Sequence, residues 1–239
     1  TGRTLLCRQC LCSGTLGRRR AFGAGHGAGQ LNKAMETTLK GEFVVLRPMS
    51  VADAAMTLRW RQSARAVHLN RGAQSLAAQE RWIASRPAAE YNFIIALHDG
   101  REVGMVSLCD IDPVNRRAEP GRFLIGEEEA VRGIPAAVEA MKLIYTLAFD
   151  QIRLRRVFGT ISATNQLMIK WQKYMGMKEE GRLRQHFFIN GDFQDALVYG
   201  LLDEEYRRVT LPRFNAMIAA GRRVAGPPSA SVNNLGEKS

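Results

Sequence analysis

The stretch Phe123–Phe149 constrains the fold most, because it reads as a strand, a tight turn and a long helix. Phe123–Gly126 is a short apolar run, and apolar side chains recur at close to helical spacing from Val138 onward. Pro135 suits the first position of a helix, since its missing N–H would have no partner there. A strand that feeds a helix through such a turn leaves free backbone N–H groups at the positive end of the helix. The stretch therefore predicts a phosphate-binding turn.

The positive charge of the chain is confined to its two ends. The net charge is +11, yet residues 1–34 hold six Lys/Arg and no Asp/Glu, and residues 207–239 hold six Lys/Arg and one Asp/Glu. Residues 35–206 hold 22 Lys/Arg and 22 Asp/Glu, so they are neutral. The middle part therefore has no general attraction for polyanions, and a nucleic-acid partner is not expected for it. A nucleic-acid-associated role through the two tails stays open as an alternative.

The two ends are expected to lie outside the folded unit. Residues 1–34 are too poor in large apolar side chains to pack, so we expect a disordered basic head. This head is either non-native or upstream sequence before a natural start at Met35, or an Arg-rich targeting peptide. In residues 207–239 we expect a short helix at Pro212–Ala220 and then a mobile basic tail.

The cysteines indicate neither a disulfide framework nor a metal centre. Cys7, Cys10 and Cys12 crowd into the head near His26, without the second spaced pair that a zinc site needs, and Cys109 stands alone. We therefore expect no metal, a reducing compartment and a cytoplasmic location. No apolar run is long enough to cross a bilayer, so no membrane partner is expected.

Residues 42–206 alternate between strand and helix patterns. The strands are expected at Phe43–Arg47, Tyr91–Leu97, Glu102–Asp110, Ala118–Ile125, Arg155–Ile161, Arg184–Ile189 and Phe193–Leu201. The helices are expected at Val51–Ala66, Ala77–Ser85, Pro135–Asp150 and Asn165–Met175. Asn190-Gly191 predicts a two-residue hairpin turn between the last two strands. The result is a single α+β domain with a mixed, mostly antiparallel twisted sheet flanked by helices.

Three segments in this order carry a resemblance to a known family. They are Ala118–Gly126, Arg132–Ala137 followed by Glu139-Ala140, and Asn165 with Tyr174–Met177. They resemble the coenzyme strand, the pyrophosphate loop and the second coenzyme helix of the GNAT superfamily of acetyl-CoA-dependent N-acetyltransferases. The likeness is greatest to the branch that includes ribosomal-protein and amino-sugar acetyltransferases. It covers about residues 42–206 and implies acetyl-CoA as co-substrate, splayed central strands and direct transfer to a primary amine.

The resemblance implies which groups hold the coenzyme. The implied set is Phe123, Leu124, Ile125, Arg132, Gly133, Ile134, Pro135, Ala136, Ala137 and Asn165. Backbone groups of the strand residues would bond the pantetheine arm, and one N–H would hold the thioester oxygen. Amides of the turn would bind the pyrophosphate, with a charge-assisted bond from Arg132. Pro135 stands where the family usually has glycine, which removes one donor. Asn165 would contact the coenzyme, cap the following helix, or do both.

The chemistry requires that the amine lose a proton before it attacks the thioester. Glu119 matches a glutamate that this branch often has at the start of the coenzyme strand, and it is the implied base; an exposed carboxylate at a strand end is the alternative. The leaving thiolate has a pKa near 8.5 and needs little help. The family's tyrosine, seven residues after Asn165, is Gln172 here. Tyr174 is therefore the candidate proton donor, with packing as its alternative.

The acceptor is expected to meet the first helices and the last hairpin, at Leu58–Asn70 and Arg182–Asp195. In or beside these segments lie Arg59, Arg61, Arg65, Arg71, Arg182, Arg184 and His186. Such basic groups favour a nucleotide-linked amino sugar as the acceptor. A protein N-terminus of the ribosomal-protein type is one alternative. A non-catalytic acyl-CoA-binding module, prompted by Pro135 and Gln172, is another. The partner is thus a small-molecule amine or a peptide N-terminus, and a homodimer is left open.

Overall fold

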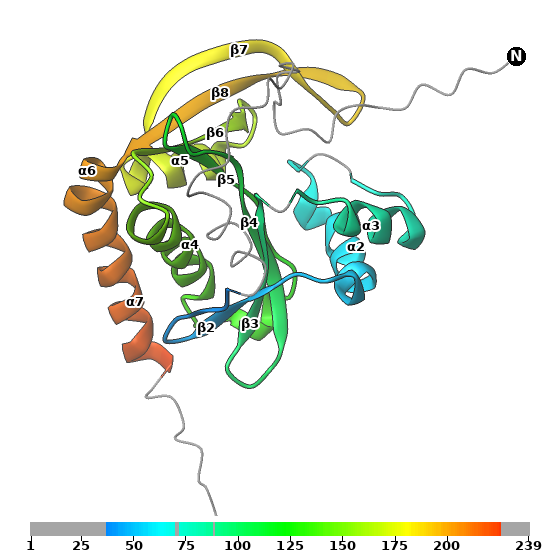
Figure 1. The fold of residues 1–239 in the computed structure, drawn as a ribbon, viewed down its shortest axis with the longest axis horizontal. Helices are drawn as coiled ribbons and strands as arrows, with labels where there is room; N and C mark the ends of the chain where they lie inside the picture. The colour runs from blue at the N-terminus through cyan, green and yellow to red at the C-terminus, as the bar shows by residue number, and fades with distance from the viewer. Residues whose placement is uncertain (1–36, 70–71, 88, 226–239) are drawn as a thin grey trace, which may run out of the picture.

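The computed structural model describes residues 37–69, 72–87 and 89–225 (Figure 1). Its strands are β1 (Leu39–Lys40), β2 (Val44–Pro48), β3 (Tyr91–Leu97), β4 (Glu102–Asp112), β5 (Arg117–Ile125), β6 (Arg156–Ser162), β7 (Lys178–Ile189) and β8 (Asp192–Leu202). Its helices are α2 (Ala54–Gln62), α3 (Leu76–Ala84), α4 (Ala136–Thr146), α5 (Gln166–Met175), α6 (Asp203–Glu205) and α7 (Leu211–Ala225). The head, with Cys7, Cys10, Cys12 and His26, lies outside the described residues.

The eight strands form one sheet in the order β1-β2-β3-β4-β5-β6-β8-β7. All neighbours are antiparallel except β5 and β6, which are parallel. This confirms the predicted α+β class and the mixed, mostly antiparallel sheet. None of the helices in the described ranges combines the length and apolarity that crossing a membrane requires.

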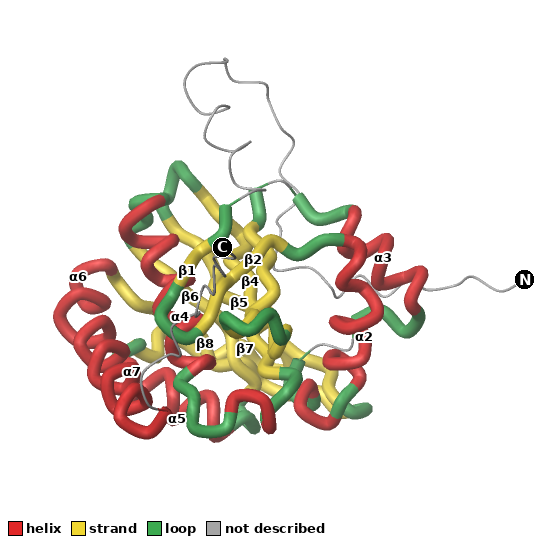
Figure 2. Tube along the Cα trace, turned by 90° about the horizontal axis from the view of Figure 1, so that it is seen from below, coloured by secondary structure: helices red, strands yellow, loops and turns green. Residues whose placement is uncertain are grey.

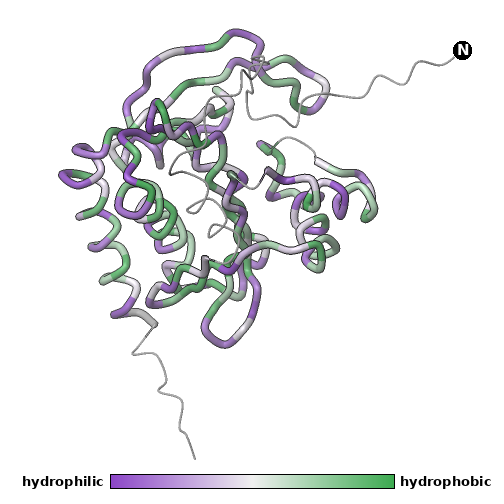
Figure 3. Tube along the Cα trace, in the orientation of Figure 1, coloured by the Kyte–Doolittle hydropathy of each residue, from purple (hydrophilic) through white to green (hydrophobic). Residues whose placement is uncertain are grey.

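Helices cover both faces of the sheet. Figure 2 shows the strands between α2 and α3 on one side and α4, α6 and α7 on the other. Side chains of β3 alternate accordingly: Phe93 and Ile95 join the larger core beside α4, and Ile94 joins a smaller one around Trp60. Figure 3 shows hydrophobic residues along α4 and hydrophilic ones along much of β7. The central strands are therefore buried from both sides.

The first predicted helix is divided. In place of one helix over Val51–Ala66, a 3₁₀ turn (Val51–Asp53) leads into α2, and a second turn (Ala64–Ala66) follows. Ser63 between them is extended, with ψ of 163°, and its hydroxyl donates to the Trp60 carbonyl at 2.7 Å. Such local bonds of serine compete with helix continuation, which accounts for the break.

The C-terminal helix is longer than predicted. In place of a short helix at Pro212–Ala220, α6, a π-helical segment (Tyr206–Thr210) and α7 follow one another. Phe214 and Ile218, four residues apart on one face of α7, are buried in the main core. The Phe214 ring lies 5.7 Å from that of Tyr145 in α4. The packed structure therefore continues into the segment beyond residue 206.

The last hairpin turns where the sequence indicated. Asn190 and Gly191 have φ of 54° and 87°, the left-handed values that a two-residue turn of this kind needs. The strand before it, β7, begins at Lys178, six residues ahead of the predicted start at Arg184. The hairpin is consequently long and extends over one end of the sheet (Figure 1).

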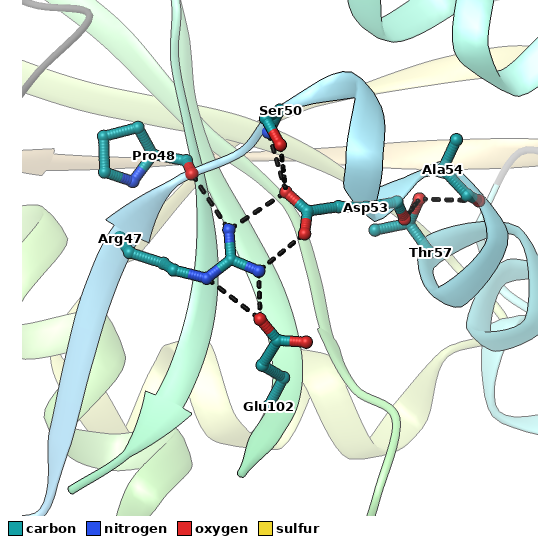
Figure 4. A network of polar contacts seen from close by, with 7 residues as sticks. All are labelled: Arg47, Pro48, Ser50, Asp53, Ala54, Thr57 and Glu102. Atoms are coloured by element: carbon teal, nitrogen blue, oxygen red, sulfur yellow. Dashed lines mark hydrogen bonds and ion pairs between the residues drawn. The ribbon is translucent and has the colours of Figure 1, made fainter. Parts of the chain in front are cut away.

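An ion-pair network joins β2 to the start of α2 and to β4 (Figure 4). The Arg47 guanidinium donates to both carboxylate oxygens of Asp53, at 2.5 and 3.0 Å, and to Glu102. Burial alone would raise the pKa of Asp53, but hydrogen bonds from Arg47 and the Ser50 amide outweigh it and lower that pKa. The network fixes how the chain leaves β2 and enters the helices on that face.

Glu139 ties the first turn of α4 to the start of β2. Its carboxylate is buried and accepts three backbone N–H bonds, from Glu42 at 2.7 Å, Phe43 at 2.6 Å and Val44 at 2.9 Å. A Cβ on Gly41 would lie 2.5 Å from the Glu139 carboxyl carbon, so a larger residue there would displace the carboxylate from these amides. This clamp holds the beginning of α4 against the sheet.

We predict that Glu139→Ala lowers the free energy of unfolding by roughly 3 kcal/mol, because three backbone amides, one buried and two partly buried, lose their carboxylate acceptor. Denaturant unfolding measures this loss. The matched control is Glu129→Ala, since Glu129 is 82% exposed and pairs only at the surface with Arg132; it should change stability by less than about 1 kcal/mol. Equal effects of the two variants would contradict the role given to the clamp.

Candidate active site

The site begins where β5 separates from β6. The two strands pair only at Arg117 with Arg156 and at Ala118 with Val157. Beyond this point β5 continues to pair with β4, while β6 pairs with β8 along its whole length. The expected splay of the central strands is therefore present, and from Glu119 onward β5 has one edge without a strand partner.

A cleft of about 540 Å³ opens between the separated strands. Its walls come from β5 and β6, from α4 and α5, and from the segments around α3 and the last hairpin. The lining residues used below are Glu119, Arg122, Phe123, Gly159, Asn165, Gln172, Arg61, Trp82, Met141 and His186. In the described ranges, no three His, Cys, Asp or Glu side chains gather as a metal site would require.

Glu119 lines the cleft where the strands separate, one residue past the last position at which β5 pairs with β6. Its carboxylate extends toward β6, with one oxygen 3.6 Å from where a Cβ on Gly159 would stand. Burial raises the pKa of Glu119 to about 7 and the charge of Asp110 adds to this, while a bond from the Thr160 amide and the charge of Arg122 oppose it. A carboxylate of this pKa can accept a proton near neutral pH.

The turn before α4 leaves three of the five predicted amides without a backbone acceptor, those of Gly133, Ala136 and Ala137. Pro135 is the residue before the first helical position rather than the first, and its carbonyl accepts from Glu139 at 2.9 Å. The Ile134 amide already donates to Val131 at 2.9 Å, and the Arg132 amide to Glu129 at 3.4 Å. The Val138 amide, in the first turn of α4, likewise has no backbone acceptor among the described residues. The Arg132 side chain is exposed and bonded to Glu129 at 2.6 Å.

The three strand residues predicted to contact the pantetheine arm divide between two edges of β5. The Leu124 carbonyl faces Gly104 of β4, at 2.4 Å from where a Cβ on that glycine would stand. Backbone groups of successive strand residues point to opposite edges, so those of Phe123 and Ile125 face the open side. Arg122, with φ of 53°, lies where the register of β4 and β5 shifts, which is typical of a bulge.

Asn165 and Gln172 both line the cleft from α5, and Tyr174 does not. The Asn165 side-chain oxygen accepts from the Met168 amide at 3.1 Å, so the predicted cap is present and its NH₂ group stays available as a donor. The buried Gln172 Oε1 has no hydrogen-bond partner within the described residues. Tyr174 is 53% exposed, with its ring 5.2 Å from the Arg213 guanidinium of α7.

The acceptor end is less basic than the sequence suggested. Of the predicted basic set, Arg61 and His186 line the cleft. The described arginines Arg59, Arg65 and Arg182 instead pair with Glu127, Glu128 and Asp195. Arg71 lies outside the described residues. The charges at this end therefore give little support to a phosphorylated acceptor.

Sequence reasoning missed a cluster at this end. Arg122 bonds Glu90 at 2.8 Å and Asn92 at 3.0 Å, and it lies 5.4 Å from the Trp82 ring. The Arg86 guanidinium lies 4.5 Å from the same ring. The sequence shows only that an arginine and a tryptophan are present. It could not predict the cluster, because its members come from three separate segments, around Trp82, around Glu90 and at Arg122.

The turn before α4 and the cleft both leave unsatisfied the kinds of group that coenzyme A would bind, and the turn residues lie outside the lining of the cleft itself. Four amides point from the turn at the positive end of α4, where a diphosphate is favoured. Met141 of α4 lines the cleft five residues beyond Ala136, about 8 Å along the helix axis. The open edge at Phe123 and Ile125 and the orphaned Gln172 oxygen suit the amides of an extended pantetheine arm.

We predict a distinct pH dependence of stability for Glu119→Gln. The native pKa of Glu119, about 7, lies above the ordinary value near 4.3, so between these pH values the native chain keeps a proton that the unfolded chain loses. The unfolding free energy of the wild type should therefore fall as pH rises through this range, relative to the variant. Denaturant unfolding from pH 4 to 8, with exposed Glu204 changed to Gln as control, checks this. Parallel curves for wild type and Glu119→Gln would contradict it.

Comparisons with known proteins agree with this geometry. A family model described as an acetyltransferase (GNAT) domain matches residues 44–178. YdaF of Bacillus subtilis (strain 168), named as a candidate ribosomal N-acetyltransferase, is 36% identical over 123 residues, 51% of this chain and 66% of that protein. The spermidine N(1)-acetyltransferase of Escherichia coli (strain K12) is 30% identical over 118 residues, 49% of this chain and 61% of that protein. The chain thus spans less than two thirds of these relatives' length.

Solved structures give the same fold over more of the chain. A candidate acetyltransferase from T. thermophilus superposes with a TM-score of 0.63 at 26% identity, covering 76% of this chain and 96% of that one. A GCN5-related N-acetyltransferase from Brucella melitensis gives a TM-score of 0.65 at 24% identity, covering 77% of this chain and 86% of that one. At this identity the likeness shows the fold alone. With a family model spanning more than half of its residues, the chain belongs to the GNAT acetyltransferase family.

Proposed function

We propose that this chain transfers an acetyl group from acetyl-CoA to a primary amine by direct attack, and that the acceptor amine is the α-amino group of a peptide or protein. The observation that carries the proposal is the position of Glu119. It is the acidic side chain in the lining of the cleft, beside the point where β5 and β6 part. Its pKa of about 7 makes it a proton acceptor near neutral pH.

Each group of the chain has one task in this account. Acetyl-CoA supplies the activated thioester. The turn amides of Gly133 and of Ala136 to Val138 bind its diphosphate, and the open edge of β5 aligns the arm. An N–H of that edge donates to the thioester oxygen as negative charge develops on it. Glu119 takes the proton that the attacking amine gives up, directly or through a water.

The pKa of Glu119 favours an α-amine over an alkyl amine. An α-ammonium has a pKa near 7.7–8.0 and a lysine-like ammonium one near 10.4. With Glu119 at about 7, moving the proton to it costs about 1 kcal/mol for the first and about 5 kcal/mol for the second. The relative named for a ribosomal substrate points to the same acceptor class.

The charges of the cleft argue against a polyamine, although three of the similar proteins are named for spermidine. Glu119 is the one acidic residue among those described that line the cleft, whereas Arg61 and Arg122 both reach it. A trication would meet few compensating carboxylates there. The amino-sugar acceptor rested on a basic set of which Arg59, Arg65 and Arg182 are paired elsewhere, so the peptide amine has the better support.

Thiol release from acetyl-CoA with a panel of acceptors tests this proposal. We expect turnover with a short peptide bearing a free N-terminus, and none with the same peptide blocked there but carrying a free lysine. Spermidine and glucosamine should be poor acceptors. Glu119→Gln should lower kcat about 10²–10⁴-fold with acetyl-CoA binding unchanged, since only proton transfer is removed. Tyr174→Phe and Glu204→Gln serve as controls and should resemble the wild type.

Each other result has a definite meaning. Preferred turnover of spermidine would overturn the acceptor class and leave the transferase intact. Acetyl-CoA binding without thiol release for any acceptor would show the non-catalytic module. An unaltered kcat for Glu119→Gln across pH would remove Glu119 from the mechanism.

A further inference from the structure

We propose that α7 is a positioning element of the coenzyme site, acting through the contact between Gly221 and Pro135. This inference rests on the proposed binding of coenzyme A at the turn before α4. The family model ends at residue 178, so α7 lies outside the part of the chain that it matches.

The contact is close enough to require glycine. A Cβ built on Gly221 would lie 2.5 Å from Cγ and 2.6 Å from Cδ of Pro135, far inside van der Waals distance. The proline ring cannot swing aside as the end of a flexible side chain can, because it is bonded to its own backbone nitrogen. Any added atom at Gly221 must therefore move the turn itself or the helix.

Two further contacts keep α7 in place along α4. At one end of α7, Phe214 packs against Tyr145 near the end of α4, and at the other Gly221 meets Pro135 just before α4, so the two helices run antiparallel. Beside Gly221, Arg222 forms an ion pair with Glu42, at 2.5 Å through Nε. The Glu42 amide in turn donates to Glu139 in the first turn of α4. Figure 1 shows the two helices lying side by side.

This arrangement has a direct consequence for the free amides. Pro135 is followed at once by Ala136, Ala137 and Val138, whose N–H groups are proposed to hold the diphosphate. Their direction depends on the backbone of Pro135, with φ of −77° and ψ of 38°. A hydrogen bond weakens steeply once its donor is misaligned, so displacing Pro135 should weaken coenzyme binding. Gly221, which lacks a Cβ, thus leaves room for the ring of Pro135 just before α4.

Equilibrium binding of coenzyme A to four proteins tests the inference. Gly221→Ala should weaken binding about tenfold, equivalent to ~1.4 kcal/mol, because the new methyl displaces Pro135. Pro135→Gly/Gly221→Ala should regain most of the affinity, since the ring that met the methyl is gone. The matched control is Gly181→Ala, where nothing lies within 4 Å of the added Cβ. Thermal unfolding of each free protein confirms that it is folded.

The outcomes separate this inference from the proposed function. No binding by the wild type would overturn the proposed function and this inference with it. Binding by the wild type with equal affinity in Gly221→Ala, or no recovery in the double variant, would overturn the inference alone. Should Gly221→Ala not fold, hydrogen exchange of the wild type decides. Coenzyme A should slow exchange at the amides of Gly221 to Arg223, and unchanged exchange there would contradict the role of α7.

Discussion

The parting of β5 from β6 after Ala118 is the constraint on which the rest of this structure depends. Because β6 stays paired with β8 over seven positions and β5 stays paired with β4, neither strand can close the gap. The open edge of β5, the cleft and the burial of Glu119 all follow from that divergence. The raised pKa of Glu119 is then a property of the sheet topology, since its carboxyl lies between two strands that no longer pair.

The helix that faces this gap is held at its beginning by contacts from two directions. Glu139 binds three amides of the chain entering β2, and Pro135 rests against Gly221 of the last helix. These contacts leave the N–H groups of the first turn free while fixing the backbone that carries them. Because this backbone is already held in place, less conformational entropy is lost when an anion binds to it, which favours tight and well-aligned binding. The cradle is therefore built by segments far from it in sequence.

Much of the fold was predictable from local patterns, because local chemistry decided it. The strand pattern at Tyr91–Leu97 gave the observed bounds of β3, and Asn190-Gly191 gave the hairpin turn. The strand, turn and helix at the centre were found for the same reason, since a short apolar run and a proline at a helix start are local signals. The break at Ser63 was missed because its hydroxyl bonds back to the chain, a choice that periodicity does not show.

The candidate site was less predictable, since pairing across the sheet and between helices settles its details. The arginines near the first helices pair with acids that follow β5, such as Glu127 and Glu128, which no local pattern reveals. The amide of Ile134 is used within its own turn. Tyr174, the candidate proton donor, lies exposed beside Arg213 rather than in the cleft with Gln172. The contact of Gly221 with Pro135 joins distant parts of the chain and had no signal in the sequence.

A crystal structure of the full chain with coenzyme A bound tests the central claim most directly. The account predicts diphosphate oxygens within hydrogen-bond distance of the amides of Ala136, Ala137 and Val138. It also predicts the pantetheine arm along the open edge of β5, with the sulfur near Glu119. A diphosphate held elsewhere, with β5 and β6 drawn together and the gap filled by side chains, would contradict it.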